Sequence, residues 1–183
     1  AGGNYNVAVG ANAGTAITTG VSNVAIGKSS LHANQTGGEN TAVGMCALLG
    51  ESGNQSCRNT AIGTNAGKCV TTATDLLALG QGTAVNLTTG KFNTLVGGAL
   101  TGVAGATGEA MTTGCCNVAV GNGALKLTTT SNDNTAVGTL ALGANSTGAS
   151  NVAIGALALD ANTTANNNTA VGVCALGANT TGH

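Results

Sequence analysis

The side chains that could do chemistry are few and widely spaced. Only 6% of the 183 residues are charged, and two are histidines. The acidic residues are Glu39, Glu51, Asp75, Glu109, Asp133 and Asp160. No spacing among them forces two carboxylates into one site for general acid–base catalysis. The glycines never form the G-x-x-x-x-G-K-[ST] pattern that cradles phosphate. We therefore expect no catalytic residues, no cofactor and no enzymatic activity.

Binding to nucleic acid, metal or membrane is equally unsupported by the residue types. The basic residues are Lys28, Arg58, Lys68, Lys91 and Lys126. They are isolated, the net charge is −1, and one Tyr and one Phe cannot form a platform for stacking bases. His32 and His183 lack cysteine partners at zinc-site spacing. No apolar run approaches the roughly 20 residues needed to span a bilayer.

The six cysteines indicate an oxidising, extracellular setting, because their number is even and the chain carries little charge. Cys57 lies six residues before Gly63 and Cys69 lies six after it. If the chain reverses at this glycine, both side chains fall at the same end of the unit, which predicts a Cys57–Cys69 disulfide. The remaining cysteines are Cys46, Cys115, Cys116 and Cys174. Free thiols, a vicinal bridge and links between subunits are all open for them.

Seven N-x-[ST] sequons are candidate glycosylation sites. They begin at Asn34, Asn54, Asn86, Asn145, Asn162, Asn167 and Asn179. Chance sequons are expected in a chain so rich in Asn and Thr. Four of them nevertheless share one phase of the repeat described next, so glycans there would line one edge of the molecule and shield it from sideways association.

A repeated pentad of the type N-[TV]-A-[VI]-G organises the chain. Its closing glycines are Gly10, Gly27, Gly44, Gly63, Gly80, Gly97, Gly121, Gly138, Gly155 and Gly172. Seven of the nine spacings are 17 residues, and the other two are 19 and 24. Downstream of each pentad comes a looser block, which ends in Ala-Leu in several coils, and in several coils a block of the type Thr-Thr-Gly closes the unit. The sequence therefore predicts one repeat domain over residues 1–183, with insertions near 50–58 and 101–115.

The residue types favour strands over helices within each unit. The pentads place β-branched residues beside Gly, and the Thr-Thr-Gly blocks oppose helix propagation. Alternation with a period of two predicts a short strand with two different faces, and the Ala-Leu block predicts a second short strand. We therefore expect an all-β fold, a parallel β-solenoid or β-roll of about ten 17-residue coils.

Stacking of coils would bury two apolar columns. We expect an inward ladder at the last strand position, made of Val9, Ile26, Val43, Ile62, Leu79, Val96, Val120, Val137, Ile154 and Val171. The residues expected to oppose it are Leu31, Leu48, Leu125, Leu142, Leu159 and Leu176. The pentad asparagines can stack amide on amide. The alanine between the two strand residues is compatible with close lateral packing or with a crowded core.

The unit N-[TV]-A-[VI]-G-x-x-A-L-x-x-N-T-T-G resembles the repeats in the heads of trimeric autotransporter adhesins and in phage tail-fibre proteins. The resemblance covers residues 6–182. It implies a left-handed parallel β-roll, a three-chain assembly, and a place outside the cell or on the surface of a cell or virion.

The chain as a whole predicts a structural and possible adhesive role. The first pentad begins at Asn6 and the last coil runs to His183 without an atypical capping repeat. We expect a subunit of an extracellular fibre or surface appendage that assembles with itself, by head-to-tail stacking of uncapped ends or as a homotrimer. The alternatives are an ice-binding solenoid and a segment of a trimeric adhesin or tail fibre. The Thr-Thr pairs count against ice binding, because they fall in probable turns and are interrupted at Gly37, Gly53 and Ala165.

Overall fold

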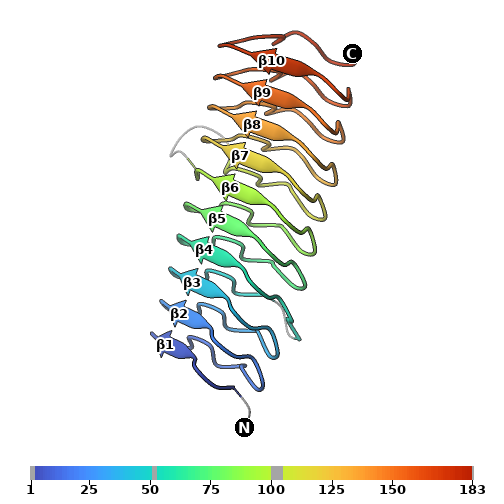
Figure 1. Ribbon diagram of the computed structural model, residues 1–183. Coiled ribbons are helices and arrows are strands. Elements are labelled where there is room, and N and C mark those ends of the chain that lie inside the picture. Colours follow the sequence, from blue (N-terminus) through green and yellow to red (C-terminus); the bar gives the residue numbers. More distant parts are fainter. Residues whose placement is uncertain (1–2, 51–52, 100–104, 183) are drawn as a thin grey trace.

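The computed structural model describes residues 3–50, 53–99 and 105–182. Over these residues the chain is a stack of similar coils, and each coil contributes one three-residue strand to a single sheet (Figure 1). The strands are β1 Val7–Val9, β2 Val24–Ile26, β3 Thr41–Val43, β4 Thr60–Ile62, β5 Leu77–Leu79, β6 Thr94–Val96, β7 Val118–Val120, β8 Thr135–Val137, β9 Val152–Ile154 and β10 Thr169–Val171. The parallel β-solenoid expected from the repeat is confirmed, with about nine turns.

Every strand pairs in parallel with its neighbours in the sequence. The order runs from β1 to β10 without a crossover. Equivalent residues of successive pentads are always partners, as Thr135 with Val152. The two long spacings do not disturb this register, since Thr41 still pairs with Thr60 and Thr94 with Val118. Of the predicted insertions, residues 51–52 and 100–104 lie outside the described residues.

The glycine that ends each strand is required by the closeness of the coils. Gly138 has a φ of 134°, a backbone conformation that side-chain-bearing residues rarely adopt. A Cβ added to Gly138 would lie 2.5 Å from both the carbonyl carbon and the carbonyl oxygen of Gly155 in the next coil. The strand-closing glycines therefore allow a turn and a coil separation that any larger residue would prevent.

The predicted inward ladder is wrong, because the strands present their opposite face to the core. From β2 to β10 the middle residue of each strand is buried, and it is Ala in every one of them except β6, which has Leu95, whereas Ala8 of β1 is exposed. The flanking Val, Ile, Leu and Thr side chains point outward. Ile26, Ile62 and Ile154 are 39%, 44% and 41% exposed. Opposite the turns that insert a Leu, the strand position has room for little more than a methyl group, so Ala fills it.

The opposing Leu column is confirmed as core, although the segment carrying it is not a strand. Leu31, Leu48, Leu125, Leu142 and Leu159 are fully buried, whereas Leu176 in the coil of β10 is 51% exposed. The predicted second strand is replaced by turns, because residues such as Leu140 and Leu142 adopt positive φ values of 57° and 51°. These turns still stack, as Leu142 N–H donates to the Ala158 carbonyl at 3.0 Å.

Two interior positions of the coil compensate each other in volume. Where the turn carries a buried Leu, the residue three positions later is small or polar, as with Leu142 and Asn145. Where the turn carries Gly, that later residue is large, as with Gly67 and buried Val70. A Cβ on Gly67 would lie 3.5 Å from Val70 Cγ2 and 2.9 Å from Leu48 Cδ2. Each coil therefore fills its thin core with one large apolar side chain on this side.

Candidate functional surfaces

The structure gathers no catalytic or metal-binding constellation among the described residues. They enclose no pocket, and nowhere do three or more His, Cys, Asp or Glu side chains come together as metal ligands. Glu51 and His183 lie outside the described residues. His32 accepts or donates a 2.7 Å hydrogen bond with the Thr15 hydroxyl, at the edge of the first coils.

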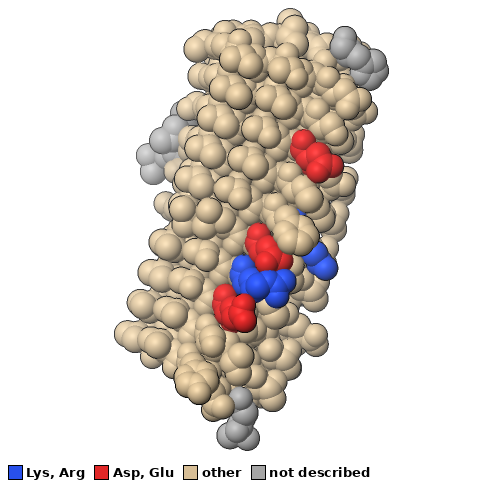
Figure 2. Space-filling view, viewed as in Figure 1, with Lys and Arg blue, Asp and Glu red and all other residues tan. Residues whose placement is uncertain are grey.

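Some of the charged side chains lie close together on the face of the rod shown in Figure 2. Arg58 binds Asp75 of the next coil through two hydrogen bonds, Nε to Oδ1 at 2.7 Å and Nη2 to Oδ2 at 3.0 Å. The Arg58 guanidinium lowers the pKa of Asp75, first through this hydrogen bond, with a further contribution from Thr74. The pair is solvent-exposed, so it contributes little to stability.

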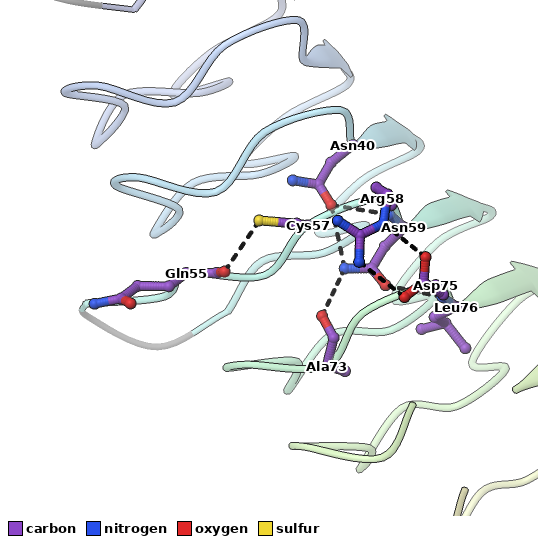
Figure 3. Close-up of polar contacts among 8 residues, drawn as sticks. All are labelled: Asn40, Gln55, Cys57, Arg58, Asn59, Ala73, Asp75 and Leu76. Atoms are coloured by element: carbon purple, nitrogen blue, oxygen red, sulfur yellow. Dashed lines mark hydrogen bonds and ion pairs between the residues drawn. The ribbon is translucent and has the colours of Figure 1, made fainter. Parts of the chain in front are cut away.

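The predicted Cys57–Cys69 disulfide is absent, and all six cysteines are free thiols. The in-register stack explains this, because a residue faces the residue at the same phase of the neighbouring coil. Cys57 therefore forms a parallel β-bridge with Thr74 of the next coil, while Cys69 N–H donates to the Val85 carbonyl at 3.1 Å. Cys57 Sγ donates instead to the Gln55 carbonyl (Figure 3). Chain reversal at Gly63 does not return the two cysteines to one point.

A column of buried amides, the asparagine ladder, runs along the inside of the strand entrance. Its members are Asn6, Asn23, Asn40, Asn59, Asn93, Asn117, Asn134, Asn151 and Asn168. In a typical step, the backbone N–H and Nδ2 of Asn59 both donate to Asn40 Oδ1, at 3.0 and 3.1 Å (Figure 3). Asn59 Nδ2 also donates to the Ala73 carbonyl at 2.9 Å, which ties the loop of its own coil to the strand.

The ladder has one interruption, at Leu76. The Leu76 backbone N–H still donates to Asn59 Oδ1 at 3.0 Å, but the side chain offers no amide to the next coil. Leu76 is 2% exposed and fits the space of an asparagine. The ladder therefore consists of two hydrogen-bonded runs, one up to Asn59 and one from Asn93 onward. The predicted amide stacking is confirmed. The exception, Leu76, is visible in the sequence, because the pentad LLALG begins with Leu in place of Asn.

The four sequons that share one phase do not form an outward row. Asn34, Asn145 and Asn162 are fully buried. Asn145 Nδ2 donates to the Gly148 carbonyl at 2.9 Å, so the atom that would carry a glycan closes the Asn-x-Thr-Gly turn instead. Asn179, in the coil of β10, closes the same kind of turn onto Gly182. The repeated sequon is thus a turn motif, and the expected glycan row does not fit the folded coil.

The remaining sequons differ in accessibility. Asn54 is 2% exposed and donates to the Val70 carbonyl at 2.6 Å. Asn86 and Asn167 are exposed, although Asn86 Nδ2 donates to the Glu109 carbonyl at 2.9 Å. These two remain the positions at which the prediction of glycosylation is compatible with the fold.

Two regular surfaces emerge that the sequence did not predict. The first is the outer face of the sheet, formed by the first and last residue of every strand. The column of first residues is Val7, Val24, Thr41, Thr60, Leu77, Thr94, Val118, Thr135, Val152 and Thr169. The column of last residues is the former inward ladder, from Val9 to Val171. Neither column contains a charged residue. Figure 2 shows side chains standing in such separate columns along the rod.

The second surface is a threonine column on the loop side. It consists of the exposed residues Thr19, Thr36, Thr72, Thr89, Thr113, Thr130, Thr147, Thr164 and Thr181. Gln55 takes this place in the coil between β3 and β4. The residue just before each threonine behaves differently, since its hydroxyl donates along the stack, as Thr112 Oγ1 does to the Thr129 carbonyl at 3.2 Å. The sequence could have revealed this column, because the two side chains of each Thr-Thr pair alternate between bonding along the stack and facing outward.

No family model, no curated protein and no solved structure matches the chain. The described residues also include no helix of the length and apolarity that crossing a membrane requires. The function is therefore inferred from the geometry of the rod and its surfaces.

Proposed function

We propose that the chain is a structural subunit of an extracellular fibre or surface appendage, and that it assembles by continuing its own stack. The observation that supports this most is the in-register parallel stack, in which each coil is completed by its neighbours. Leu159, for example, is fully buried, and its N–H donates to the Ala175 carbonyl of the following coil at 3.0 Å. The setting outside the cell or on a virion rests on the resemblance of the repeat to adhesin heads and tail fibres.

Any two layers have complementary shapes, because each is a layer of the same repeat. Within the rod, one coil covers the apolar side chains and backbone groups of the previous coil. A coil of β1 placed on the coil of β10 would repeat this contact. The contact is heterologous and does not close, so it extends into a filament. Carbohydrate or protein adhesion along such a filament is a further role that the resemblance suggests.

Substitution Gly172→Ala tests the stacking directly. The preceding glycine, Gly155, shows the geometry: its added Cβ would lie 2.5 Å from the Gly172 carbonyl carbon of the next layer. At Gly172 itself the added Cβ meets only Ala175 Cβ, at 3.8 Å. The variant chain therefore folds, and its new methyl group occupies the place of the next layer. Backbone strain at its φ of 128° costs about 1–3 kcal/mol.

Negative-stain electron microscopy of the wild-type chain should show unbranched filaments that Gly172→Ala fails to form. Gly53→Ala is the control, because Gly53 also has positive φ, at 85°, and its added Cβ meets nothing within 4 Å. Circular dichroism checks that both variants keep the β structure. Filaments of undiminished length from Gly172→Ala, or none from the wild type, would refute end-to-end stacking.

The threonine column favours ice binding as a second candidate function. Its hydroxyls repeat at the strand spacing of about 4.8 Å and make no hydrogen bond to another described residue. Gly37 and Ala165, which looked like interruptions, occupy the buried position after the threonine, so the column is interrupted only at Gln55 among the described residues. A regular row of small hydroxyl groups is suited to ordering water in a lattice.

Thermal hysteresis and ice recrystallisation assays test this candidate. The double variant Thr113→Tyr/Thr130→Tyr should abolish hysteresis by disrupting the column. Asn167→Tyr is the control, because its exposed position is occupied by an aromatic residue in two other coils, Tyr5 and Phe92. A wild-type chain without hysteresis contradicts ice binding and leaves the filament proposal unaffected.

A further inference from the structure

The outer face of the sheet leaves a continuous apolar surface open among the described residues. In the interior of the rod, Val118 and Val120 are each 37% exposed, and Ile62 is 44% exposed. The column of last strand residues is Val, Ile or Leu in all ten strands, so it carries no hydroxyl group. Contiguous apolar surface of this kind marks an interaction site in a soluble protein.

Polar and charged side chains border one edge of this face. The position two residues before each strand is charged in four coils, at Glu39, Arg58, Asp75 and Asp133, and it carries the exposed aromatics Tyr5 and Phe92 in two others. Charged side chains thus lie beside the two strand columns and do not interrupt them (Figure 2). An apolar centre with a polar edge is usual in a protein–protein contact.

The area of the face is sufficient for a stable pair of chains. Ten strands at about 4.8 Å give a length of about 45 Å, and two outward residues with their side chains span about 15 Å. Covering this rectangle on two partners removes about 1,300 Å² from water, which falls within the range of specific interfaces.

The periodicity of the face identifies the partner. Methyl-bearing side chains project at every strand, with grooves between the layers. A partner interdigitates along the whole length only if its own layers have the same spacing. A second copy of the chain meets this condition, while an irregular protein surface meets it at a few layers only. Ice is a poorer partner for this face, because hydroxyl groups occur in only half of the first column and in none of the second.

We propose that two copies of the chain pack face to face through the outer face of the sheet. This contact is lateral and isologous, and it is independent of end-to-end stacking. The pair resembles a β-sandwich whose two sheets come from different chains, with the apolar side chains of both interdigitated between them.

The test is sedimentation equilibrium of Gly172→Ala, in which end stacking is blocked, and of the wild-type chain in parallel. We expect a dimer for Gly172→Ala. Adding Ile62→Lys and Val120→Lys places unpaired charges in the contact and should raise the dissociation constant at least about 100-fold. The control adds Thr72→Lys and Thr130→Lys, which put the same charges on the threonine column, and it should remain dimeric.

Two outcomes would overturn the lateral contact. One is a Gly172→Ala chain that is monomeric at all concentrations, and the other is a dimer that survives the two face lysines. If the chain is monomeric and its thermal hysteresis is lost with the face lysines but kept with the threonine-column lysines, the face is assigned to ice. If Gly172→Ala is unfolded by circular dichroism, the mean diameter of wild-type filaments decides: a double rod supports the contact and a single rod refutes it.

Discussion

Replacing Asn134 by Asp should convert one step of the asparagine ladder into a pH-dependent weakness. Asn134 Nδ2 donates to Asn117 Oδ1 at 3.2 Å and to the Gly148 carbonyl at 3.0 Å, and the residue is fully buried. A carboxylate has the same shape but turns an acceptor toward these two acceptors. Burial and the missing donor both raise the pKa of the new carboxyl group above its value in the unfolded chain.

The magnitude follows from the size of this shift. Full burial raises a carboxyl pKa by about 3–5 units, and each pH unit between the unfolded pKa of about 4 and the folded pKa costs about 1.4 kcal/mol, so the loss at pH 7 is about 4 kcal/mol. Below pH 4, roughly the unfolded pKa, the group is protonated in both states and this penalty is absent. The penalty grows as the pH rises and levels off above the folded pKa.

Urea denaturation of the wild type and the variant at pH 4 and at pH 7 measures this difference. The control is Asn167→Asp, at an exposed position where Asp75 and Asp133 occur naturally in other coils. It should unfold like the wild type at both pH values. An Asn134→Asp chain whose stability relative to this control is the same at pH 4 and pH 7 would refute the account of the ladder as a buried network that depends on its amide donors.

Three further predictions concern the core and the ion pair. Leu142→Ala should lower the free energy of unfolding by about 2–5 kcal/mol, while Leu176→Ala, at the half-exposed end of the same column, should lower it by less than about 1 kcal/mol in urea denaturation. Ala136→Val should destabilise by about 1–3 kcal/mol, because its buried position has no room for two more methyl groups; a neutral effect would contradict an alanine core. The pKa of Asp75, measured by NMR titration, should lie below its ordinary value and return toward it in Arg58→Gln, and an unchanged pKa would contradict the hydrogen-bonded pair.

The period and the parallel register could be predicted from the sequence because they depend on equal spacing alone. Each pentad must meet the next at the same phase, whatever its side chains do, so Ala136 faces Ala153 and Asn134 faces Asn151. The asparagine ladder could be predicted for the same reason. The disulfide failed because its argument used distance along one coil, whereas contacts in this fold join equal phases of successive coils.

The orientation of the strands could not be predicted from hydrophobicity, since both faces of the pentad are apolar. Hydrophobicity ranks Val137 above Ala136, and on that ranking the larger side chain belongs inside. The thickness of the coil decides otherwise. The turn opposite the strand already inserts Leu142 into the interior, so the strand can add only a methyl group at that level. The β-branched residues are then left outside, where their shape suits a pleated strand and their apolar surface remains to be covered.

That exposed surface connects the packing of one coil to the association of whole chains. A coil with a thicker core would bury Val137 and present a polar outer face. Such a rod would lack the exposed apolar surface that favours pairing. The β-branched residues favour strand formation, but the coil is too thin to bury them at the strand position, so they lie on the outer face. Repetition then multiplies one exposed pair of side chains into two continuous columns. Because its core is small, each coil depends on its neighbours along the axis. The same small core leaves apolar side chains on the outer face of the rod, where a second rod can cover them.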